Sequence, residues 1–307
     1  MNSPESFKSH QTISETTSAS GESLPFSRTL LIFDFDDTLF CTKYFDTFSL
    51  SYPDIFDCNI SLEESHPNLI KELKELESTI IYIFTKLLMN YDIIIISNAD
   101  FKWIENCLTH FLSELKEYIS ENDIKIYSAK NMYSKTVKNS NEWKIKCFKK
   151  AVKDFYENEL NNLYLTVISI GDNNDEKRAV FKLTKENIFR KLTPKFIHMI
   201  SFPSAASIIL QLKYIEENIC NIVNEDKNIF KLGIELINSN VKIKCISEKY
   251  KKNFETSINN SYLNNLKNMI NKCEILSENS IDKKGLDDEI DNEKKEKCFL
   301  GKKLYFS

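Results

Sequence analysis

The chain has 307 residues, of which 42% are hydrophobic and 28% are charged, and its formal net charge is −4. The apolar fraction excludes a wholly disordered chain, and the near-neutral balance argues against a protein that packages nucleic acid. Only five glycines are present, which excludes collagen-like, glycine-linker and Walker-type sequences. The eight cysteines are spread along the chain without a CxxC pair, so we interpret them as reduced thiols of a cytoplasmic protein.

The first 28 residues are rich in Ser and Thr and predict a disordered tail, without the apolar core of a signal peptide. Order is expected to begin at residues 29–33, a continuous apolar run typical of a strand buried on both faces. No apolar run reaches the roughly 18 residues of a membrane span, so we expect no membrane association.

The chain from residue 29 to about 224 alternates between predicted strands and helices. Short apolar runs predict the strands, and apolar residues spaced three or four positions apart predict the helices. The strands cover residues 29–33, 91–96, 124–128, 163–170 and 195–200, and the helices cover 66–90 and 100–118 and begin near 142 and 203. This alternation predicts an α/β fold with a doubly wound, mainly parallel sheet.

The composition changes after about residue 225, where Lys, Asn and Glu dominate. We therefore place the folded domain at 29–224 and an extension without strands at 225–307. An apolar stripe from Tyr250 to Cys273 predicts one amphipathic helix in this extension. That helix either packs on the domain's own surface or binds a protein partner.

Polar residues follow the predicted strands at positions where a site can form. Asp34 and Asp36 follow the first strand, Ser97 and Asn98 end the second, and Asp172 follows a later one. Sites in open α/β sheets lie outside the carboxyl ends of strands, so these residues converge at one edge. Carboxylates held together need a cation between them, and an all-oxygen ligand set favours Mg²⁺.

Such a set of residues suits phosphoryl transfer. A carboxylate beside a divalent ion can attack phosphorus and form an aspartyl-phosphate. A second acid two residues later can protonate the leaving oxygen and then deprotonate the hydrolytic water. A hydroxyl and a lysine can bind the phosphoryl oxygens and offset their charge.

Four segments together resemble the motifs of the haloacid dehalogenase-like hydrolase superfamily. Residues 31–39, LIFDFDDTL, resemble its first motif, and residues 93–98, IIIISN, are similar to its second. Lys144, early in a predicted helix, fits the third motif, and residues 167–172, VISIGD, with Glu176 are similar to the fourth. The four occur in the right order, each on the expected element, over about residues 28–220.

The resemblance implies a Rossmann-like hydrolase fold and a role for each motif residue. Asp34 is then the nucleophile and Asp36 the general acid/base, and Ser97, Asn98 and Lys144 bind the phosphoryl group. The implied Mg²⁺ ligands are Asp34, Asp36 through its backbone carbonyl, Asp172, and Glu176 through water. Lys146 remains an alternative to Lys144, and Asp175 an alternative to Glu176. Asp37 stands where many members have Gly, and we interpret it as structural.

The gaps between the motifs are too short for a full cap domain, although residues 41–65 are long enough for a small lid. In this superfamily a capless site usually serves large substrates such as phosphoproteins. We therefore expect an Mg²⁺-dependent phosphohydrolase that acts on a phosphorylated small molecule or phosphoprotein. The alternative is a weak or inactive hydrolase-fold module that binds or regulates a partner. A polynucleotide end phosphatase is less favoured, because no Lys/Arg cluster flanks the motifs.

Overall fold

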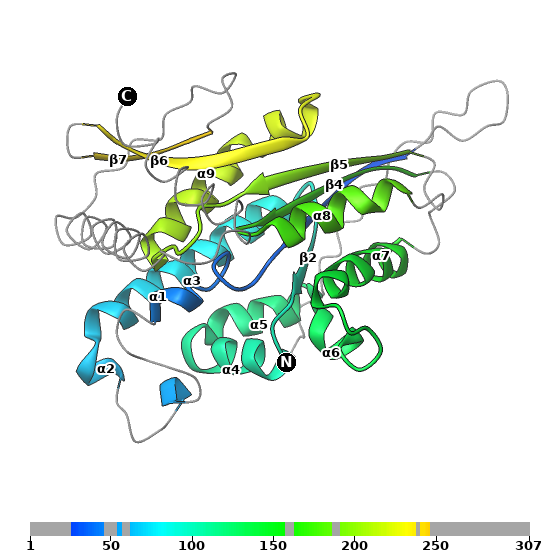
Figure 1. Ribbon diagram of the computed structural model, residues 1–307. Coiled ribbons are helices and arrows are strands. Elements are labelled where there is room, and N and C mark those ends of the chain that lie inside the picture. The colour runs from blue at the N-terminus through cyan, green and yellow to red at the C-terminus, as the bar shows by residue number, and fades with distance from the viewer. Residues whose placement is uncertain are drawn as a thin grey trace, which may run out of the picture.

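The computed structural model describes residues 26–45, 54–56, 62–156, 163–185, 191–237 and 240–245. Within these ranges the chain forms a seven-stranded sheet in the order β3-β2-β1-β4-β5-β6-β7. Neighbouring strands pair in parallel, except that β7 is antiparallel to β6. The predicted α/β class and mainly parallel sheet are therefore confirmed (Figure 1).

The strands are β1 (Phe26–Phe33), β2 (Asp92–Ser97), β3 (Lys125–Ser128), β4 (Leu163–Gly171), β5 (Lys191–His198), β6 (Ile229–Ile237) and β7 (Asn240–Cys245). The helices are α1 (Thr42–Phe45), α2 (Leu62–Ser65), α3 (Pro67–Leu88), α4 (Phe101–Phe111), α5 (Ser113–Glu121), α6 (Ala129–Tyr133), α7 (Trp143–Phe155), α8 (Asn174–Lys182) and α9 (Ala205–Asn224). Three short 3₁₀ turns are also described: η2 (Asp54–Phe56), η3 (Ser140–Glu142) and η4 (Leu183–Lys185).

Alternate side chains of the central strands enter two separate cores, one on each face of the sheet. In β1, Leu31 and Phe33 join the core beneath α3, α4, α5 and α9, whereas Leu30 and Ile32 join the core beneath α6, α7 and α8. Figure 1 shows these two groups of helices on opposite sides of the sheet. Strands covered on both faces are nearly continuous apolar runs, which is why they were recognisable in the sequence.

The helix predicted over 100–118 is two helices, α4 and α5. Leu112 separates them with a non-helical backbone (φ −136°, ψ 52°), although neither Gly nor Pro marks the break. The carboxylate of Glu77 on α3, which is buried, accepts the Leu115 N–H at 3.0 Å in the first turn of α5. A contact from a distant helix thus satisfies a backbone group that the break leaves free.

The prediction that no strand follows residue 225 is wrong, because β6 and β7 extend the sheet there. The Phe196 N–H of β5 donates to the Asn228 carbonyl at 2.8 Å, and Phe230 of β6 is buried. Lys195 is also buried, and its Nζ donates to the carbonyls of Glu225 and Lys227. Apolar residues of β7 alternate with lysines, a pattern typical of strands at a sheet edge, and this pattern hid the strand in the sequence.

Several predictions from the sequence lie outside the described residues. They concern most of the N-terminal tail, the amphipathic stripe from Tyr250 to Cys273, and the charged residues that follow it. In the part of the chain that the structure describes, no helix is both long and apolar enough to cross a membrane. The cysteines in that part are free thiols: Cys41, Cys107, Cys147, Cys220 and Cys245.

Candidate active site

Asp34 is held at the end of β1 by the sheet itself. Its N–H donates to the Ile170 carbonyl of β4 at 2.9 Å, so the carboxylate emerges between the two central strands. The chain then makes a tight turn in which Asp37 has a positive φ of 54° and the Phe40 N–H returns to the Phe35 carbonyl at 2.9 Å. A glycine would adopt this φ without strain, so Asp37 occupies a backbone position that favours glycine.

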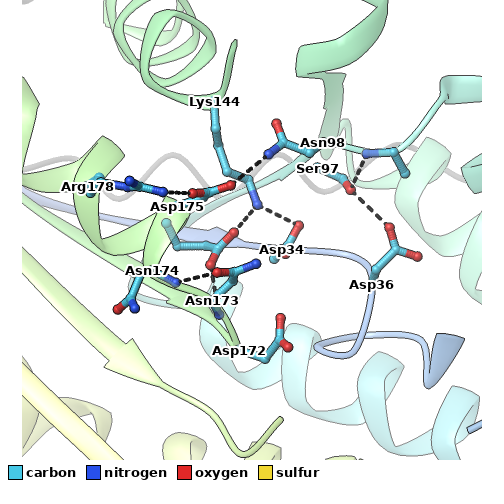
Figure 2. A network of polar contacts seen from close by, with 12 residues as sticks. Asp34, Asp36, Ser97, Asn98, Lys144, Asp172, Asn173, Asn174, Asp175 and Arg178 are labelled. Atoms are coloured by element: carbon cyan, nitrogen blue, oxygen red, sulfur yellow. Dashed lines mark hydrogen bonds and ion pairs between the residues drawn. The ribbon is translucent and has the colours of Figure 1, made fainter. Parts of the chain in front are cut away.

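Lys144 of α7 joins Asp34 to Glu176 inside the protein. Only 1% of Lys144 is exposed, and its Nζ lies 2.9 Å from Asp34 Oδ1 and in close contact with Glu176 Oε1 (Figure 2). Burial lowers the pKa of Lys144, but Asp34 and Glu176 more than offset this and raise it, so the ammonium stays charged. Lys146 is exposed, and the structure therefore places Lys144 rather than Lys146 at the site.

Glu176 is fixed from its other oxygen by the start of α8. Its Oε2 accepts the Asn173 N–H at 2.9 Å, and the Asn173 side chain caps the same helix end. Burial raises the pKa of Glu176 and Lys144 opposes that shift. Asp175 points elsewhere and pairs with Arg178 and Asn98, so Glu176 rather than Asp175 lies beside Lys144.

Asp36 accepts hydrogen bonds from two side chains that the sequence analysis did not assign to the site. Thr42 Oγ1 donates to Asp36 Oδ1 at 2.5 Å, and Trp103 Nε1 donates to the same oxygen at 2.9 Å. Burial raises the pKa of Asp36, while the Thr42 and Trp103 hydrogen bonds lower it and nearby Asp34 raises it. A raised pKa is what a carboxyl group needs to start a reaction as the acid.

Ser97 and Asn98 turn their side chains in different directions. Ser97 Oγ accepts the Ala99 N–H at 3.0 Å and lies 3.4 Å from Asp36 Oδ2, at the edge of hydrogen-bond distance. Asn98 Nδ2 lies 3.4 Å from Asp175 Oδ2, and Asn98 Oδ1 is buried without a hydrogen bond. Figure 2 shows Ser97 facing Asp36 and Asn98 facing Asp175, so of these two residues only Ser97 lies against an aspartate that follows β1.

Lys43 of α1 contacts the carboxylates on the far side of the site. Its Nζ lies 2.6 Å from Asp37 Oδ2 and 3.3 Å from Asp172 Oδ2, and its N–H donates to Asp37 Oδ1 at 3.0 Å. Burial lowers the pKa of Lys43, but the ion pairs with Asp37 and Asp172 raise it overall. The pKa of Asp172 rises to about 6 because it is buried and lies near Asp34 and Asp37, against the opposing effect of Lys43.

The site carries more negative charge than its lysines neutralise, which bears on whether a cation fits. Five carboxyl groups face two ammonium groups, an excess of three formal negative charges when all are ionised: Asp34, Asp36, Asp37, Asp172 and Glu176 against Lys43 and Lys144. Asp34 Oδ1 is buried, and the Lys144 ammonium lies 2.9 Å from it. The donors are all oxygen, and carboxylates in excess of the neighbouring ammonium groups fit a hard divalent cation.

No group of three His, Cys, Asp or Glu side chains arranged to hold a metal ion occurs among the described residues. The ligand set implied by the resemblance is Asp34, Asp172, the backbone carbonyl of Asp36, and Glu176 through water, so only two of its carboxylates would contact the metal directly. Of the predicted residues, the structure thus brings Asp34, Asp36, Ser97, Lys144, Asp172 and Glu176 to one edge of the sheet.

Sequence reasoning missed Lys43, Thr42 and Trp103 as site residues. Trp103 lies within the helix predicted over 100–118, and its indole ring contacts Phe40 and Phe56 like an ordinary core residue. Only its N–H reaches Asp36, and no pattern in the sequence separates such an indole from an ordinary core residue. For Lys43 a signal existed, because clustered aspartates need a cationic partner and Lys43 is the next basic residue in the chain.

Comparison of the chain with protein-family models, with curated proteins and with solved structures finds no match.

Proposed function

We propose that this protein is an Mg²⁺-dependent phosphomonoesterase that forms an aspartyl-phosphate on Asp34, on a capless haloacid dehalogenase-like hydrolase fold. The observation that carries the proposal is the buried contact of Asp34 with Lys144, itself fixed by Glu176. Asp36 lies two residues further on with a raised pKa, as a general acid next to a nucleophile requires. The same six motif residues that carry the resemblance meet at this edge of the sheet.

The chemistry follows from the positions of these side chains. The Asp34 carboxylate attacks phosphorus, and the bond from phosphorus to the ester oxygen breaks as Asp36 gives its proton to that oxygen. Asp36 then takes a proton from water, whose oxygen attacks phosphorus, and inorganic phosphate leaves while Asp34 is restored. Lys144 and Ser97 bind phosphoryl oxygens. A Mg²⁺ ion would be held by Asp34, the Asp36 carbonyl and Asp172, with Glu176 through water, and would supply further charge neutralisation.

The absence of a large insertion in the described chain supports a sizeable substrate. The described elements between β1 and β2 are the short α1, η2 and α2 and the long α3, and those between β2 and α7 are α4, α5, β3, α6 and η3. We propose that this capless site accepts phosphoryl groups on large substrates such as phosphoproteins.

One observation favours the second candidate function, a catalytically weak or inactive binding module. The Lys43 ammonium forms ion pairs with the carboxylates of Asp37 and Asp172. Asp172 is one of the carboxylates implied as a metal ligand. A site closed by its own lysine would bind partners without turning over a phosphate ester.

The two candidates are separated by turnover of an aryl phosphate with Mg²⁺ and with EDTA. A phosphomonoesterase is active with Mg²⁺, and loses activity in EDTA and in the Lys144→Met variant. Lys146→Met is the matched control, because Lys146 lies on the same helix but is exposed, and it should keep wild-type turnover. A wild-type protein that is inactive with Mg²⁺, or equally active in EDTA, contradicts the proposed function.

A further inference from the structure

Phe202 is an exposed aromatic residue in a strained backbone conformation beside the site. It lies in the loop between β5 and α9, 57% of it is exposed, and its φ is 58°. A positive φ is rare for a bulky residue and persists only where the surroundings enforce it. An exposed apolar ring and a strained backbone both disfavour the folded state, so a structural role alone does not account for Phe202.

The loop that carries Phe202 is tied to the site at Asp172. His198 Nε2 and Ser201 Oγ donate to the Asp172 carbonyl at 3.1 and 3.2 Å. Ser201, the residue before Phe202, and His198, at the end of β5, are therefore anchored on the backbone of a residue that we place in the metal-binding set. These contacts hold the start of the loop against the site.

Lys43 links the ring of Phe202 directly to the carboxylates. Its Nζ lies 4.7 Å from the centroid of the Phe202 ring and 3.3 Å from Asp172 Oδ2. Because both distances start at the same nitrogen, the ring centroid and this carboxylate oxygen are at most about 8 Å apart. Phe202 therefore stands at the rim of the site, beside a carboxylate of the proposed metal-binding set, where a ring on the substrate can stack at the usual separation of roughly 4.5–7 Å between centroids.

We infer that Phe202 is a specificity residue whose exposed ring packs against an aromatic leaving group, so that the site favours phosphate esters of phenols over esters of aliphatic alcohols. This inference rests on the proposed function. The phosphotyrosyl group and small aryl phosphates share this chemistry. Lys43 covers part of the ring, and the remaining exposed surface is available to the substrate.

The test compares kcat/KM for four substrates: free O-phosphotyrosine, free O-phosphoserine, and one peptide carrying either residue. The variants are Phe202→Ala, Phe202→Leu, which keeps apolar bulk without a ring, and Phe202→Trp, which keeps a ring. The matched control is Tyr82→Ala on α3, because Tyr82 is also exposed and has a lysine, Lys86, 4.5 Å from its ring centroid. Thermal unfolding verifies that each variant is folded.

The measured quantity is the ratio of kcat/KM for the tyrosine ester to that for the serine ester. It should fall about two- to twelvefold in Phe202→Ala and Phe202→Leu, the range expected for one aromatic pair, and stay near wild type in Phe202→Trp and Tyr82→Ala. A ratio that is unchanged in Phe202→Ala, or that changes only with the peptides, overturns the inference. In the wild type, a larger kcat/KM for the phosphotyrosyl peptide than for free phosphotyrosine identifies a protein as the source of the ester.

The outcome also separates this inference from the function on which it rests. A wild-type protein that hydrolyses none of the four substrates contradicts the proposed function, and the role of Phe202 falls with it. A wild type that hydrolyses them, with a ratio insensitive to Phe202, leaves the phosphatase proposal intact and removes only the aromatic subsite.

Discussion

A single methyl group added at Gly171 should disturb the site from its base. Gly171 ends β4, and a Cβ at this position would lie 2.6 Å from Glu176 Cγ and 3.1 Å from Cδ. Contacts this short do not persist, so the Glu176 side chain or the backbone beneath it has to move. The backbone of Gly171 lies outside the left-handed region, so Gly171→Ala tests this contact without adding backbone strain.

The cost follows from what Glu176 holds in place. Overpacking a tight site costs about 1–3 kcal/mol, and losing a helix-capping interaction costs about 1 kcal/mol. We therefore expect Gly171→Ala to lower the free energy of unfolding by about 2–4 kcal/mol, which corresponds to a fall in Tm of about 5–15 °C. Turnover should fall as well, because Lys144 loses its contact with Glu176.

Urea and thermal unfolding of a double-mutant cycle measure this effect. The cycle contains wild type, Gly171→Ala, Glu176→Ala and the double variant, and stability is followed by circular dichroism. Because Glu176→Ala removes the atoms that the new methyl group would strike, the double variant should be more stable than the sum of the single changes predicts. A Gly171→Ala protein within about 0.5 kcal/mol of wild type, or strictly additive effects, would refute the contact.

Three further changes test other parts of the structure. Trp103→Phe removes the N–H bonded to Asp36 and should lower kcat about tenfold with little change in KM, as steady-state kinetics will show. Glu72 has an oxygen buried without a hydrogen bond, and burial followed by Glu75 raises its pKa to about 7, so its ionisation destabilises the fold as pH rises from about 4.5 to 7. Glu72→Gln should therefore raise the free energy of unfolding by about 1 kcal/mol above pH 7, after allowance for solvent screening, and leave it unchanged below pH 4.5. Equal stabilisation at both pH values in denaturant titrations would contradict this. Truncation after Cys245 should preserve the Tm of the domain, whereas truncation after residue 225 removes β6 and should lower it clearly in a thermal melt.

The parts of the fold that follow from local pattern were predictable from the sequence. Strands β1, β2 and β4 are mostly apolar because helices cover both their faces, and the aspartates that follow β1 and β4 meet because parallel strands share one edge. Helical periodicity places Lys144 and Lys146 on different faces of one helix and left both as candidates, and the structure buries Lys144 against Asp34.

The parts that depend on distant contacts were not predictable. The break at Leu112 is supported by Glu77 from another helix, and Trp103 reaches Asp36 from a position that looks like ordinary core. The positive φ of Phe202 has no local signal, since neither Gly nor Asn occupies the position. Strand β7 was missed because alternation of apolar residues and lysines at a sheet edge resembles a polar extension, whereas β6 is mostly apolar and its sequence did carry a strand signal.

The most direct test of the central claim is to trap the phosphoryl group on Asp34. The protein is quenched in acid during turnover of an aryl phosphate with Mg²⁺ and treated with borohydride, which reduces an acyl phosphate to an alcohol. Peptide mass spectrometry then reads the modified position, with Asp34→Asn as the control. The proposed mechanism predicts homoserine at position 34, and no such product in the variant. Substrate turnover with Asp34 unmodified, or with the modification on another residue, would contradict it.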